Sequence, residues 1–438
     1  MKTKTPKETQ TPKGTRDYYF EYLEKRSFIE NEIRRNFELW GFKEIRTPTF
    51  EYFDSLSTGT GSELRESMFR FEDKSGRELA LRAEMTSPVA RMVATQLKNH
   101  LLPMKMYYLS PMFRYEEPQS GRQREFWQAG VELYGSSLPD ADAEVIAMFI
   151  NTLKRIGLNE VRVRLGHVGL FKAIVEEAGI SLTEAAAIRR SIDKKDETGL
   201  EAALSEVELS ASMKEVFRTL PKLHGYLEDI NKIRNMVQSE KVKNCIDNIS
   251  DIIKILDLYG LYFDHVTLDL GIVRGIDYYT GAVFEGFIPD LGIALGGGGR
   301  YDELVEQFGG GAIPATGFAI GVDRCHLALE KRKFDFGLKK RPQIFVSYTD
   351  RESKKEAINI AMDLREIDLP VETDIMERKL QKGLDYANKK GIRYVIIAGE
   401  TEYKQEGVLV KDMRNSTQKL LNRIDLVKYF ERRKRYLV

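Results

Sequence analysis

Residues 104–135, "MKMYYLSPMFRYEEPQSGRQREFWQAGVELYG", contain two runs of β-forming side chains around a polar segment with a glycine. This pattern predicts two antiparallel strands joined by a polar loop. Side chains alternate between the two faces of a strand, so Trp127, Ala129, Val131 and Leu133 share one apolar face. That apolar face is suited to packing in the protein core. The side chains on the opposite face therefore indicate the function of the sheet.

The opposite face of this hairpin combines an aromatic ring, an amide, carboxylates and arginines. For any single residue a solvated sheet surface is the simpler interpretation, but buried charges need partners and the segment is otherwise fit for burial. As a set they favour a site for a small zwitterion beside a phosphate, because arginine matches both carboxylate and phosphate. The residues are Arg114, Glu116, Arg124, Phe126, Gln128 and Glu132.

The segment before the hairpin begins with "EYLEKRSFIENEIRRNFELWGF" (21–42), whose apolar residues recur at helical spacing. Gly41 is well placed to end this helix in the left-handed conformation. "KEIRTPTF" (43–50) then reads as a strand interrupted by Pro48. Because proline cannot donate to a strand ladder, we expect an edge strand or part of an interface.

A strand, a polar corner and a helix are predicted for "ALRAEMTSPVARMVATQL" (80–97). Pro88 suits the first helical turn, where the missing N–H group is not needed. Thr86 or Ser87 is therefore expected to cap the helix.

The composition limits the number of domains and the class of protein. The 438 residues are enough for roughly two to four domains and for a sizeable core without disulfide bonds. No apolar run reaches the roughly 18 residues of a membrane span, so no membrane partner is expected. Two distant cysteines indicate a reducing, cytoplasmic location, and five scattered histidines do not suggest a metal site. The net charge of +1, from 68 basic and 67 acidic residues, neither favours nor excludes nucleic acid.

The pattern along the chain predicts several regions. Residues 1–13 are expected to be a solvated arm. Strand signals fade across 171–258, where a capping-box pair and long charged patterns predict a helical insertion within a larger domain, 14–335. Beyond "KKRP" (339–342), strands and helices alternate through 341–438, which is typical of a small α/β domain. That last region has 21 basic and 16 acidic residues, a net +5 that suits RNA but also an ordinary solvated surface.

Three further stretches combine glycines with charged or aromatic residues. "LGIVRGIDYYTGAVFEGF" (270–287) reads as two apolar strands around a turn that carries Arg274, and we expect this turn on a hairpin. "LGGGGRYDEL" (295–304) is interpreted as a loop that lets a ligand approach the backbone or makes a tight turn. "GFAIGVDR" (317–324) predicts a strand feeding a helix, where Arg324 either reaches a phosphate or belongs to a close-packed corner.

Taken together, these stretches resemble the histidyl-tRNA synthetases, a family of class II aminoacyl-tRNA synthetases. Three degenerate class motifs look like the helix and strand with Pro48, "FRYEEPQSGRQREFWQ" (113–128) and "GFAIGVDR". Two stretches resemble this family specifically, "RGIDYYTGAVFE" (274–285) and "GGGGRYDEL" (296–304). The resemblance begins at "GTRD" (14–17) and covers nearly the whole chain. It implies an α+β fold: an antiparallel class II catalytic sheet with flanking helices, a helical insertion and a C-terminal α/β anticodon-binding domain.

The resemblance also implies a two-step reaction. Histidine and ATP, accompanied by Mg²⁺, would give histidyl-adenylate and pyrophosphate. The histidyl group would then pass to the 3′-terminal ribose of tRNA(His). A cytoplasmic homodimer is implied as well, with Pro48 at the dimer interface.

The same resemblance assigns roles to individual residues. Arg114 would bind the α-phosphate of ATP, Arg324 the β- and γ-phosphates, and Arg274 both the α-phosphate and the substrate carboxylate. Arg114 and Arg274 are thus the expected catalytic residues, with Glu116 and Phe126 on the adenine side. The histidine site is implied to consist of Glu84, Met85, Thr86, Gln128, Glu132, Arg274, Tyr278 and Tyr279.

Two departures from the family pattern concern the motifs themselves. Family members often have proline at the position of Ala83 in "LRAE", and "GLER" where this chain has "GVDR". Asp323 is shorter than glutamate, which leaves open what its carboxylate contacts. All of the implied ligand positions are nevertheless retained.

One alternative belongs to a different functional class. A catalytically inactive relative serves as regulatory subunit of ATP phosphoribosyltransferase in histidine biosynthesis, and would keep a histidine pocket while binding protein instead of tRNA. Such relatives usually lack the C-terminal domain and the arginines for ATP, whereas this chain has the domain, Arg114 and Arg324. A class II synthetase for proline, threonine or glycine is a third possibility, and "RGIDYYTG" (274–281) speaks against it.

Overall fold

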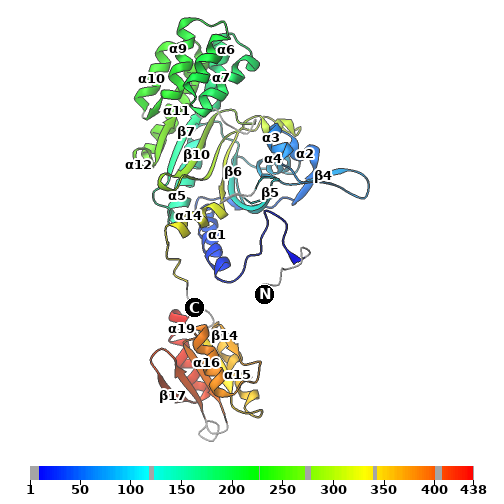
Figure 1. Cartoon of the computed structure of the whole chain (residues 1–438), viewed down its shortest axis with the longest axis vertical. Helices are drawn as coiled ribbons and strands as arrows, with labels where there is room; N and C mark the ends of the chain where they lie inside the picture. Colours follow the sequence, from blue (N-terminus) through cyan, green and yellow to red (C-terminus); the bar gives the residue numbers. More distant parts are fainter. Residues whose placement is uncertain are drawn as a thin grey trace, which may run out of the picture. The chain divides into compact units, whose positions relative to one another are not determined.

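Two compact units make up the computed structural model, Met1–Phe334 and Asp335–Val438, called the N-terminal and C-terminal units below (Figure 1). Each unit is built around a sheet of its own. The residues that the structure describes are 9–117, 123–225, 227–271, 278–338, 343–399 and 407–437.

The main sheet of the N-terminal unit has its described strands in the order β1-β5-β6-β12-β11-β10-β7-β9-β8. Neighbouring strands are antiparallel except in the pairs β1–β5 and β7–β9, so the predicted antiparallel catalytic-type sheet is confirmed. The strands are β1 (Lys43–Glu44), β5 (Met104–Phe113), β6 (Glu125–Tyr134), β7 (Arg162–His167), β8 (His224–Gly225), β9 (Val266–Asp269), β10 (Ala282–Ile288), β11 (Ile293–Arg300) and β12 (Ala315–Gly321).

The predicted hairpin at 104–135 is confirmed as β5 and β6, which pair along their whole length. Ala129, Val131 and Leu133 are buried as expected, whereas Trp127 is half-buried. On the opposite face Glu132 is only 1% exposed. At Glu132, therefore, that face is not a solvated surface.

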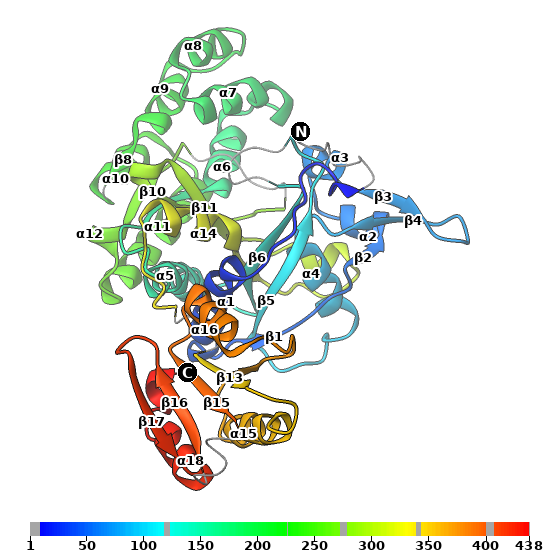
Figure 2. The ribbon, with the colours of Figure 1, turned by 60° about the horizontal axis from the view of Figure 1, so that its bottom comes forward.

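Helices cover the main sheet (Figure 2). In the first of them Ile29, Ile33 and Phe37 are fully buried, and Gly41 has a φ of 82°, the left-handed conformation expected at its end. This helix packs against two others, which lie beside it in Figure 2. The three helices are α1 (Glu21–Leu39), α5 (Pro139–Arg155) and α14 (Val322–Lys331).

A smaller antiparallel sheet, in the order β2-β4-β3, receives the chain after β1. The strand expected at 43–50 is thus divided at Pro48 between two sheets, and β1 forms an edge as predicted. The elements of this region are β2 (Phe50–Tyr52), β3 (Arg70–Glu72), β4 (Glu78–Leu81), α2 (Phe53–Ser57), α3 (Ser62–Glu66), α4 (Thr86–Thr95) and α13 (Leu304–Gln307).

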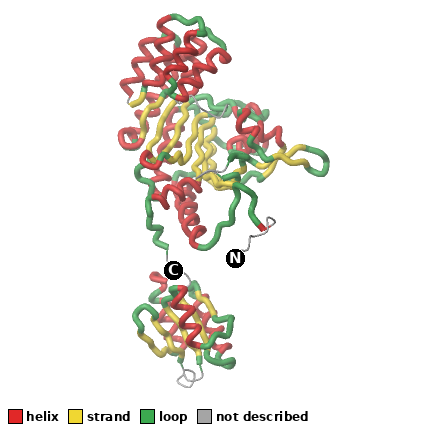
Figure 3. Tube along the Cα trace, viewed as in Figure 1, coloured by secondary structure: helices red, strands yellow, loops and turns green. Residues whose placement is uncertain are grey.

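Helices dominate the segment between β7 and β9, as predicted for the insertion (Figure 3). Ser181 caps one of them through a capping box with Glu184, also as predicted. The short strand β8, which the sequence did not suggest, pairs with β9 and joins this segment to the main sheet. The helices are α6 (Val168–Ala178), α7 (Leu182–Lys194), α8 (Glu197–Ser205), α9 (Ala211–Thr219), α10 (Leu227–Met236), α11 (Glu240–Leu258) and α12 (Tyr262–His265).

Two expectations for the glycine-bearing stretches are wrong. The glycine run at 296–299 is no loop but part of β11, where it pairs with β10 and β12. Residues 270–287 do not form a hairpin either, because β7 lies between β9 and β10 in the sheet. Residues 272–277, which contain the expected turn, lie outside the described residues.

The C-terminal unit has a sheet in the order β14-β13-β15-β16-β17, in which the first three strands are parallel. The alternation of strands and helices is confirmed. The antiparallel strand β17 was not predicted, because its sequence "TQKLL" is exposed except at Leu421. The elements are β13 (Ile344–Tyr348), α15 (Lys354–Glu366), β14 (Val371–Thr373), α16 (Leu380–Lys390), β15 (Tyr394–Ala398), β16 (Val408–Asp412), β17 (Thr417–Leu421), α18 (Arg423–Glu431) and α19 (Lys434–Leu437).

Substitution of Gly298 by alanine tests the close approach of β11 and β12. A Cβ atom there would lie 1.9 Å from the carbonyl oxygen of Gly317 and 2.7 Å from the Cα atom of Phe318, and neither backbone atom can swing aside. We expect the free energy of unfolding of the N-terminal unit to fall by roughly 1–3 kcal/mol, as at other overpacked sites. Urea unfolding followed by tryptophan fluorescence reports on this unit, because both tryptophans lie in it.

The matched control is Gly311→Ala. A Cβ atom at Gly311 meets nothing within 4 Å in the described part of the chain, and its φ is not in the left-handed region. This variant should unfold like the wild type. Equal stability of the Gly298 variant and the wild type would contradict the proposed constraint.

Candidate active site

A row of aligned residues crosses three strands on the polar face of the main sheet. Glu132 in β6 pairs with Gly317 in β12, which pairs with Gly299 in β11. A Cβ atom on Gly317 would lie 2.4 Å from Oε2 of Glu132 and 2.8 Å from the hydroxyl oxygen of Tyr301. Glycine is therefore required here for Glu132 and Tyr301 to meet above the strand.

The N-terminus of α4 brings a second carboxylate to this face. Glu84 is 5% exposed and accepts hydrogen bonds from the backbone N–H groups of Thr86 (2.6 Å) and Ser87 (2.9 Å). The prediction that Thr86 or Ser87 caps the helix is therefore wrong: the Glu84 side chain satisfies the first N–H groups, where the helix dipole favours an anion. The hydroxyl of Thr86 instead donates to Oε1 of Glu132 at 3.1 Å.

Glu132 is held between two hydroxyl groups. Thr86 donates to one carboxylate oxygen, and the buried Tyr301 donates to the other. Sequence reasoning missed Tyr301. Had the glycine run been interpreted as a strand, the alternation of faces from Gly299 would have placed Tyr301 on the same side as Glu132.

Burial raises the pKa of both carboxyl groups. The pKa of Glu132 lies well above its usual range, because desolvation is the largest effect and the negative charge of Glu84 adds to it. The pKa of Glu84 is also raised by desolvation, against which the hydrogen bonds from Ser87 and Thr86 act. Two carboxyl groups removed from water side by side favour the binding of a cation.

Tyrosine rings lie next to this pair. The ring centroids of Tyr278 and Tyr279 are 5.0 Å apart, and those of Tyr278 and Tyr301 are 5.6 Å apart. Burial raises the pKa of Tyr278 and Tyr279, so both stay neutral and keep an O–H donor. Met85 is buried in the adjacent core, where it supports the site from behind. Arg274, expected beside the tyrosines, lies outside the described residues.

Arg114 begins a second group of expected residues, just after β5. Its Nε atom donates to the carbonyl oxygen of Ala83 at 2.9 Å, which orients the guanidinium. The guanidinium carbon lies 5.2 Å from the ring centroid of Phe126, and Nη1 lies 4.0 Å from a carboxylate oxygen of Glu116. Ala83 directly precedes Glu84, so this group is tied to the carboxylate pair. The contact uses a backbone carbonyl, which a proline at position 83 would also supply.

The start of α14 lies beside the same strand. Gln128 of β6 pairs with Gly321, the residue that precedes α14. Arg324, in the first turn of this helix, donates to the carbonyl oxygen of Ala294 in β11 at 3.0 Å. The structure thus brings Gln128 next to the helix N-terminus and directs Arg324 across β12 towards β11.

Asp323 has contacts that explain its place in the fold. Its carboxylate accepts a hydrogen bond from the backbone N–H of Trp127 at 2.8 Å and lies 3.9 Å from Nη1 of Arg26. The buried Arg26 also lies over the Trp127 ring, 4.4 Å from its centroid. Asp323 therefore links α14 to β6 and α1 on the Trp127 side of the sheet.

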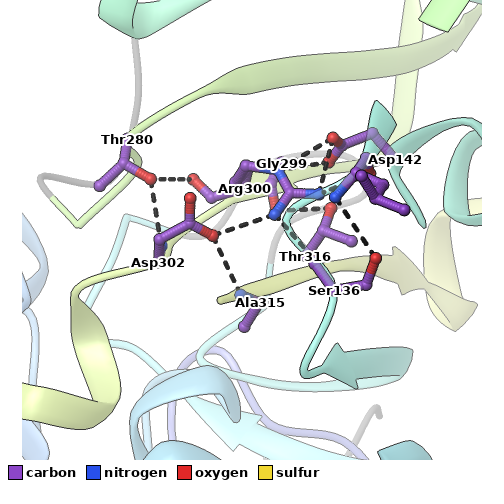
Figure 4. A network of polar contacts seen from close by, with 9 residues as sticks. Ser136, Asp142, Thr280, Gly299, Arg300, Asp302, Ala315 and Thr316 are labelled. Carbon is purple, nitrogen blue, oxygen red and sulfur yellow. Dashed lines mark hydrogen bonds and ion pairs between the residues drawn. The ribbon is translucent and has the colours of Figure 1, made fainter. Parts of the chain in front are cut away.

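A buried ion pair supports the strand that carries Tyr301 (Figure 4). Arg300 binds Asp142 of α5 through Nε at 2.9 Å and Nη2 at 2.8 Å, and both side chains are almost fully buried. Nη1 of Arg300 donates to Asp302 at 3.0 Å, and the Arg300 carbonyl oxygen accepts from the N–H of Thr280 at 2.8 Å. Thr280 directly follows the tyrosine pair, so the network fixes the backbone on which all three tyrosines are carried.

Among the described residues, no three acidic, histidine or cysteine side chains are grouped as a metal ion would require. None of the helices in this part of the chain has the length and apolar character of a membrane span. Cys245 and Cys325 are free thiols.

Comparisons with known proteins extend these findings. A family model described as histidyl-tRNA synthetase matches residues 14–325, and one described as anticodon binding domain matches residues 343–433. Together with the antiparallel sheet, these matches define a class II aminoacyl-tRNA synthetase with a C-terminal anticodon-binding domain. The chain belongs to the histidyl-tRNA synthetase family. The resemblance, the fold class and the enzyme class expected from the sequence are thereby confirmed.

Individual relatives carry two different descriptions. A histidine–tRNA ligase of Methanocaldococcus jannaschii is 42% identical over 422 residues, 96% of this chain and 99% of the relative. An ATP phosphoribosyltransferase regulatory subunit of Geobacter metallireducens is 38% identical over 413 residues, 94% of each protein. A crystal structure from Bacillus halodurans, described as ATP phosphoribosyltransferase regulatory subunit/histidyl-tRNA synthetase, matches with a TM-score of 0.78 at 31% identity, covering 91% of this chain and 100% of that one.

These relatives correct one argument from the sequence. The relative described as a regulatory subunit matches nearly the full length of this chain. The presence of a C-terminal domain therefore does not separate ligase from regulator, and the residues expected at the ATP site become the more informative feature.

Substitution of Glu132 by glutamine tests the cost of burying this carboxyl group. Because its pKa is raised, the folded state binds the proton more tightly than the unfolded chain does, and stability is lost as the pH rises above the usual carboxyl pKa of about 4.3. Glutamine keeps the volume and cannot ionise. We expect the ligand-free variant to be more stable than the wild type at pH 7 by roughly 0.5–2 kcal/mol, with a flatter dependence on pH, measured by urea unfolding.

Glu184→Gln is the control for this experiment. The exposed Glu184 carboxylate accepts from Ser181, which lowers its pKa, so its contribution to stability is present above the usual carboxyl pKa and is lost on substitution. No gain in stability is therefore expected. A Glu132→Gln protein that is less stable than the wild type at pH 7 would show that the two hydroxyl contacts outweigh the buried charge.

Proposed function

We propose that this chain is a histidine–tRNA ligase. In the first step an oxygen of the histidine carboxylate attacks the α-phosphorus of ATP, which forms histidyl-adenylate and releases pyrophosphate. In the second step a hydroxyl of the 3′-terminal ribose of tRNA(His) attacks the acyl carbon, and AMP leaves. Neither step requires a covalent enzyme intermediate, so catalysis rests on positioning and on the stabilisation of developing charge.

The observation that carries this proposal is the buried pair Glu84 and Glu132, joined by Thr86 and faced by tyrosine rings. A free amino acid brings an ammonium group, which offsets the cost of two desolvated carboxylates. An imidazole ring can exchange hydrogen bonds with Tyr278 or Tyr279 and pack against their rings. Histidine supplies both groups, and the family relatives described as histidine–tRNA ligases support the choice.

The assignment of ATP rests on the group around Arg114. We propose that its guanidinium binds the α-phosphate, with Phe126 and Glu116 on the adenine side and Arg324 at the β- and γ-phosphates. The contact with Ala83 orients Arg114 next to the carboxylate pair. Amino acid carboxylate and α-phosphate are thereby directed to one place, as an in-line attack requires.

Mg²⁺ is proposed only as the cation that accompanies the phosphates of ATP. The described residues contain no three-ligand group for a metal, so we assign no step to a protein-bound ion. The two free cysteines support a reducing, cytoplasmic location.

We propose a homodimer on separate grounds. Phe50, Tyr52 and Phe71 are all exposed on the small sheet next to Pro48, and the rings of Phe50 and Phe71 are in edge-to-face contact at 5.8 Å. Clustered exposed aromatic residues are typical of interaction surfaces. Sedimentation of the purified chain measures this directly, and a monomer at micromolar concentration would contradict it.

A second candidate function follows from the relative described as a regulatory subunit. In that role the chain would bind histidine in the same pocket and transmit its presence to a partner protein. The retention of Arg114, Phe126 and Arg324 favours the ligase, because a regulator has no use for a triphosphate site.

Pyrophosphate exchange with each amino acid in turn separates the two functions. We expect exchange with histidine alone. Glu132→Gln should weaken the apparent affinity for histidine on the order of tenfold to a hundredfold, because a charged hydrogen bond is worth roughly 1.5–3 kcal/mol. The apparent affinity for ATP should barely change. Histidine binding without exchange would support the regulator, and exchange with another amino acid would overturn the substrate assignment.

Arg274→Ala tests the arginine that the family resemblance places at the reacting atoms. We expect histidine binding to persist and adenylate formation to slow by roughly 10²–10³, the effect of removing one transition-state donor. Lysine should restore only part of the rate, since a point charge cannot bridge carboxylate and phosphate as a planar fork does. Single-turnover kinetics of each step measures this.

The melting temperature is the control for Arg274. If the arginine only forms an ion pair that steadies its turn, alanine should cost about 0–1 kcal/mol of stability and leave both steps nearly unchanged. A lower melting temperature with an intact rate of adenylate formation would therefore remove Arg274 from the catalytic residues.

A further inference from the structure

Residues 13–18, called the N-terminal segment below, pair with the start of β6 before the chain enters α1 (Figure 2). The carbonyl oxygen of Gly14 accepts from the N–H groups of Arg124, at 2.8 Å, and of Glu125, at 3.3 Å. The carbonyl oxygen of Arg124 in turn accepts from the N–H of Arg114 at 2.9 Å. Backbone hydrogen bonds therefore connect the N-terminal segment to β6 and to Arg114, the residue that directly follows β5.

The side chain of Arg124 lies against the same end of the β5–β6 hairpin and is only 13% exposed. Its Nε atom donates to the carbonyl oxygen of Glu116 at 3.1 Å. The guanidinium carbon lies 3.9 Å from the ring centroid of Tyr115, which is a cation–π contact. Because Tyr115 and Glu116 directly follow Arg114, these contacts help to fix the course of the backbone at that arginine.

Gly14 is the position in the N-terminal segment where a side chain would disturb these contacts. Its φ of 85° lies in the left-handed region, which glycine adopts without steric cost. A Cβ atom there would lie 2.5 Å from Cγ and 2.8 Å from Cβ of Arg124. These atoms belong to the stem of the arginine and not to its free end, so the whole side chain would have to move away from Tyr115 and Glu116. A substitution of Gly14 would thus act on the hairpin through Arg124.

The N-terminal segment is also connected to the helix that carries Arg324. The ring of Tyr18 stacks on that of Tyr22 in α1, with 4.8 Å between the centroids, and the Tyr22 centroid lies 4.3 Å from that of His326 in α14. The centroid of Tyr18 also lies 5.4 Å from the guanidinium carbon of Arg26, whose contact with the first turn of α14 is described above. One short stretch of the chain therefore contacts the end of the hairpin directly and α14 through α1.

We propose that Gly14 and Arg124 are positioning residues for ATP, and that the N-terminal segment holds Arg114 and Arg324 in the arrangement that a triphosphate requires. This inference rests on the proposed function, in which the latter two arginines bind the phosphates. Gly14 acts through Arg124, and Arg124 acts through the backbone that carries Arg114. A displacement of about 1 Å caused far from the reacting atoms can slow a reaction on the order of a hundredfold, so contacts of this kind affect the rate without touching the substrate.

The test compares Gly14→Ala with Gly179→Ala in the full-length chain. Gly179 follows α6 with a φ of 70°, so alanine introduces left-handed backbone strain at both positions. A Cβ atom at Gly179, however, meets nothing within 4 Å in the described part of the chain. The difference between the two variants therefore reports the contact with Arg124. Arg124→Ala and the double variant with Gly14→Ala complete a cycle, because substitutions that act through one shared contact are not additive.

Histidine-dependent pyrophosphate exchange is measured over a range of ATP and of histidine concentrations, with melting temperatures as a check on folding. We expect Gly14→Ala and Arg124→Ala each to lower kcat/KM for ATP by about tenfold to a hundredfold and to leave the KM for histidine nearly unchanged. The double variant should be as active as the less active of the two single variants. Gly179→Ala should match the wild type with both substrates.

Contrary outcomes separate the positioning role from the proposed function. Wild-type kinetics in Gly14→Ala, an equal rise of KM for both substrates, or the same loss in Gly179→Ala would each overturn the positioning role and leave the ligase intact. Full additivity in the double variant would show that Gly14 does not act through Arg124, and would overturn it as well.

Absent exchange in the wild type would instead overturn the proposed function. Equilibrium binding of ATP to the same variants then decides the positioning role. Weaker binding by Gly14→Ala and Arg124→Ala than by Gly179→Ala would support that role. Equal binding by all variants, or no binding by the wild type, would overturn it.

Discussion

The burial of two carboxyl groups side by side, Glu84 and Glu132, is the constraint on which the site is built. Neither group could remain there unassisted, because desolvation opposes the charge of each and each opposes the charge of the other. The fold supplies hydrogen-bond donors to both groups. Glu84 accepts from N–H groups at the start of α4, and Glu132 accepts from the hydroxyls of Thr86 and Tyr301. Gly317 must lack a side chain so that the last of these contacts can form. The absence of a side chain at Gly317 is thus a consequence of the Glu132 carboxylate.

The same unit also buries charge in a complete ion pair, and the contrast separates support from function. Arg300 meets Asp142 within the protein, and removal of one partner from such a pair typically costs about 3–5 kcal/mol because the other is left buried alone. The site carboxylates receive hydrogen bonds only from neutral donors, and among the described residues the one cation that acts on them is Arg114, whose charge lowers the pKa of Glu84 against the effect of burial. Charge that the protein neutralises itself holds the backbone in place, and charge that it leaves uncompensated selects what binds.

Whether a structural feature can be predicted from the sequence depends on whether it is determined by neighbouring residues in the chain. The period of two in 104–135 and the helical spacing in 21–42 are local, and both led to the right elements. The glycine run at 296–299 was wrongly predicted to be a loop, because glycine has no side chain that could show the alternation of a strand. Only its pairing with the neighbouring strands identifies it as part of β11. The residue that caps α4 was also predicted wrongly, because the Glu84 carboxylate accepts from the first N–H groups in place of the Thr86 or Ser87 hydroxyl. Arg300 and Asp142 are 158 positions apart, a pairing that no local pattern could indicate.

The proposed histidine pocket would not by itself distinguish a ligase from a regulator, since both would bind the amino acid. The difference would lie in the groups next to this pocket. Arg114 is oriented by the carbonyl oxygen of the residue directly before Glu84, so a phosphate bound by this guanidinium, as proposed, would be positioned by the same turn that carries the Glu84 carboxylate. A regulator that only senses histidine gains nothing from this coupling. A reaction that joins a carboxylate to an α-phosphate depends on it, because the distance between the two reacting atoms is then set by a few rigid backbone bonds.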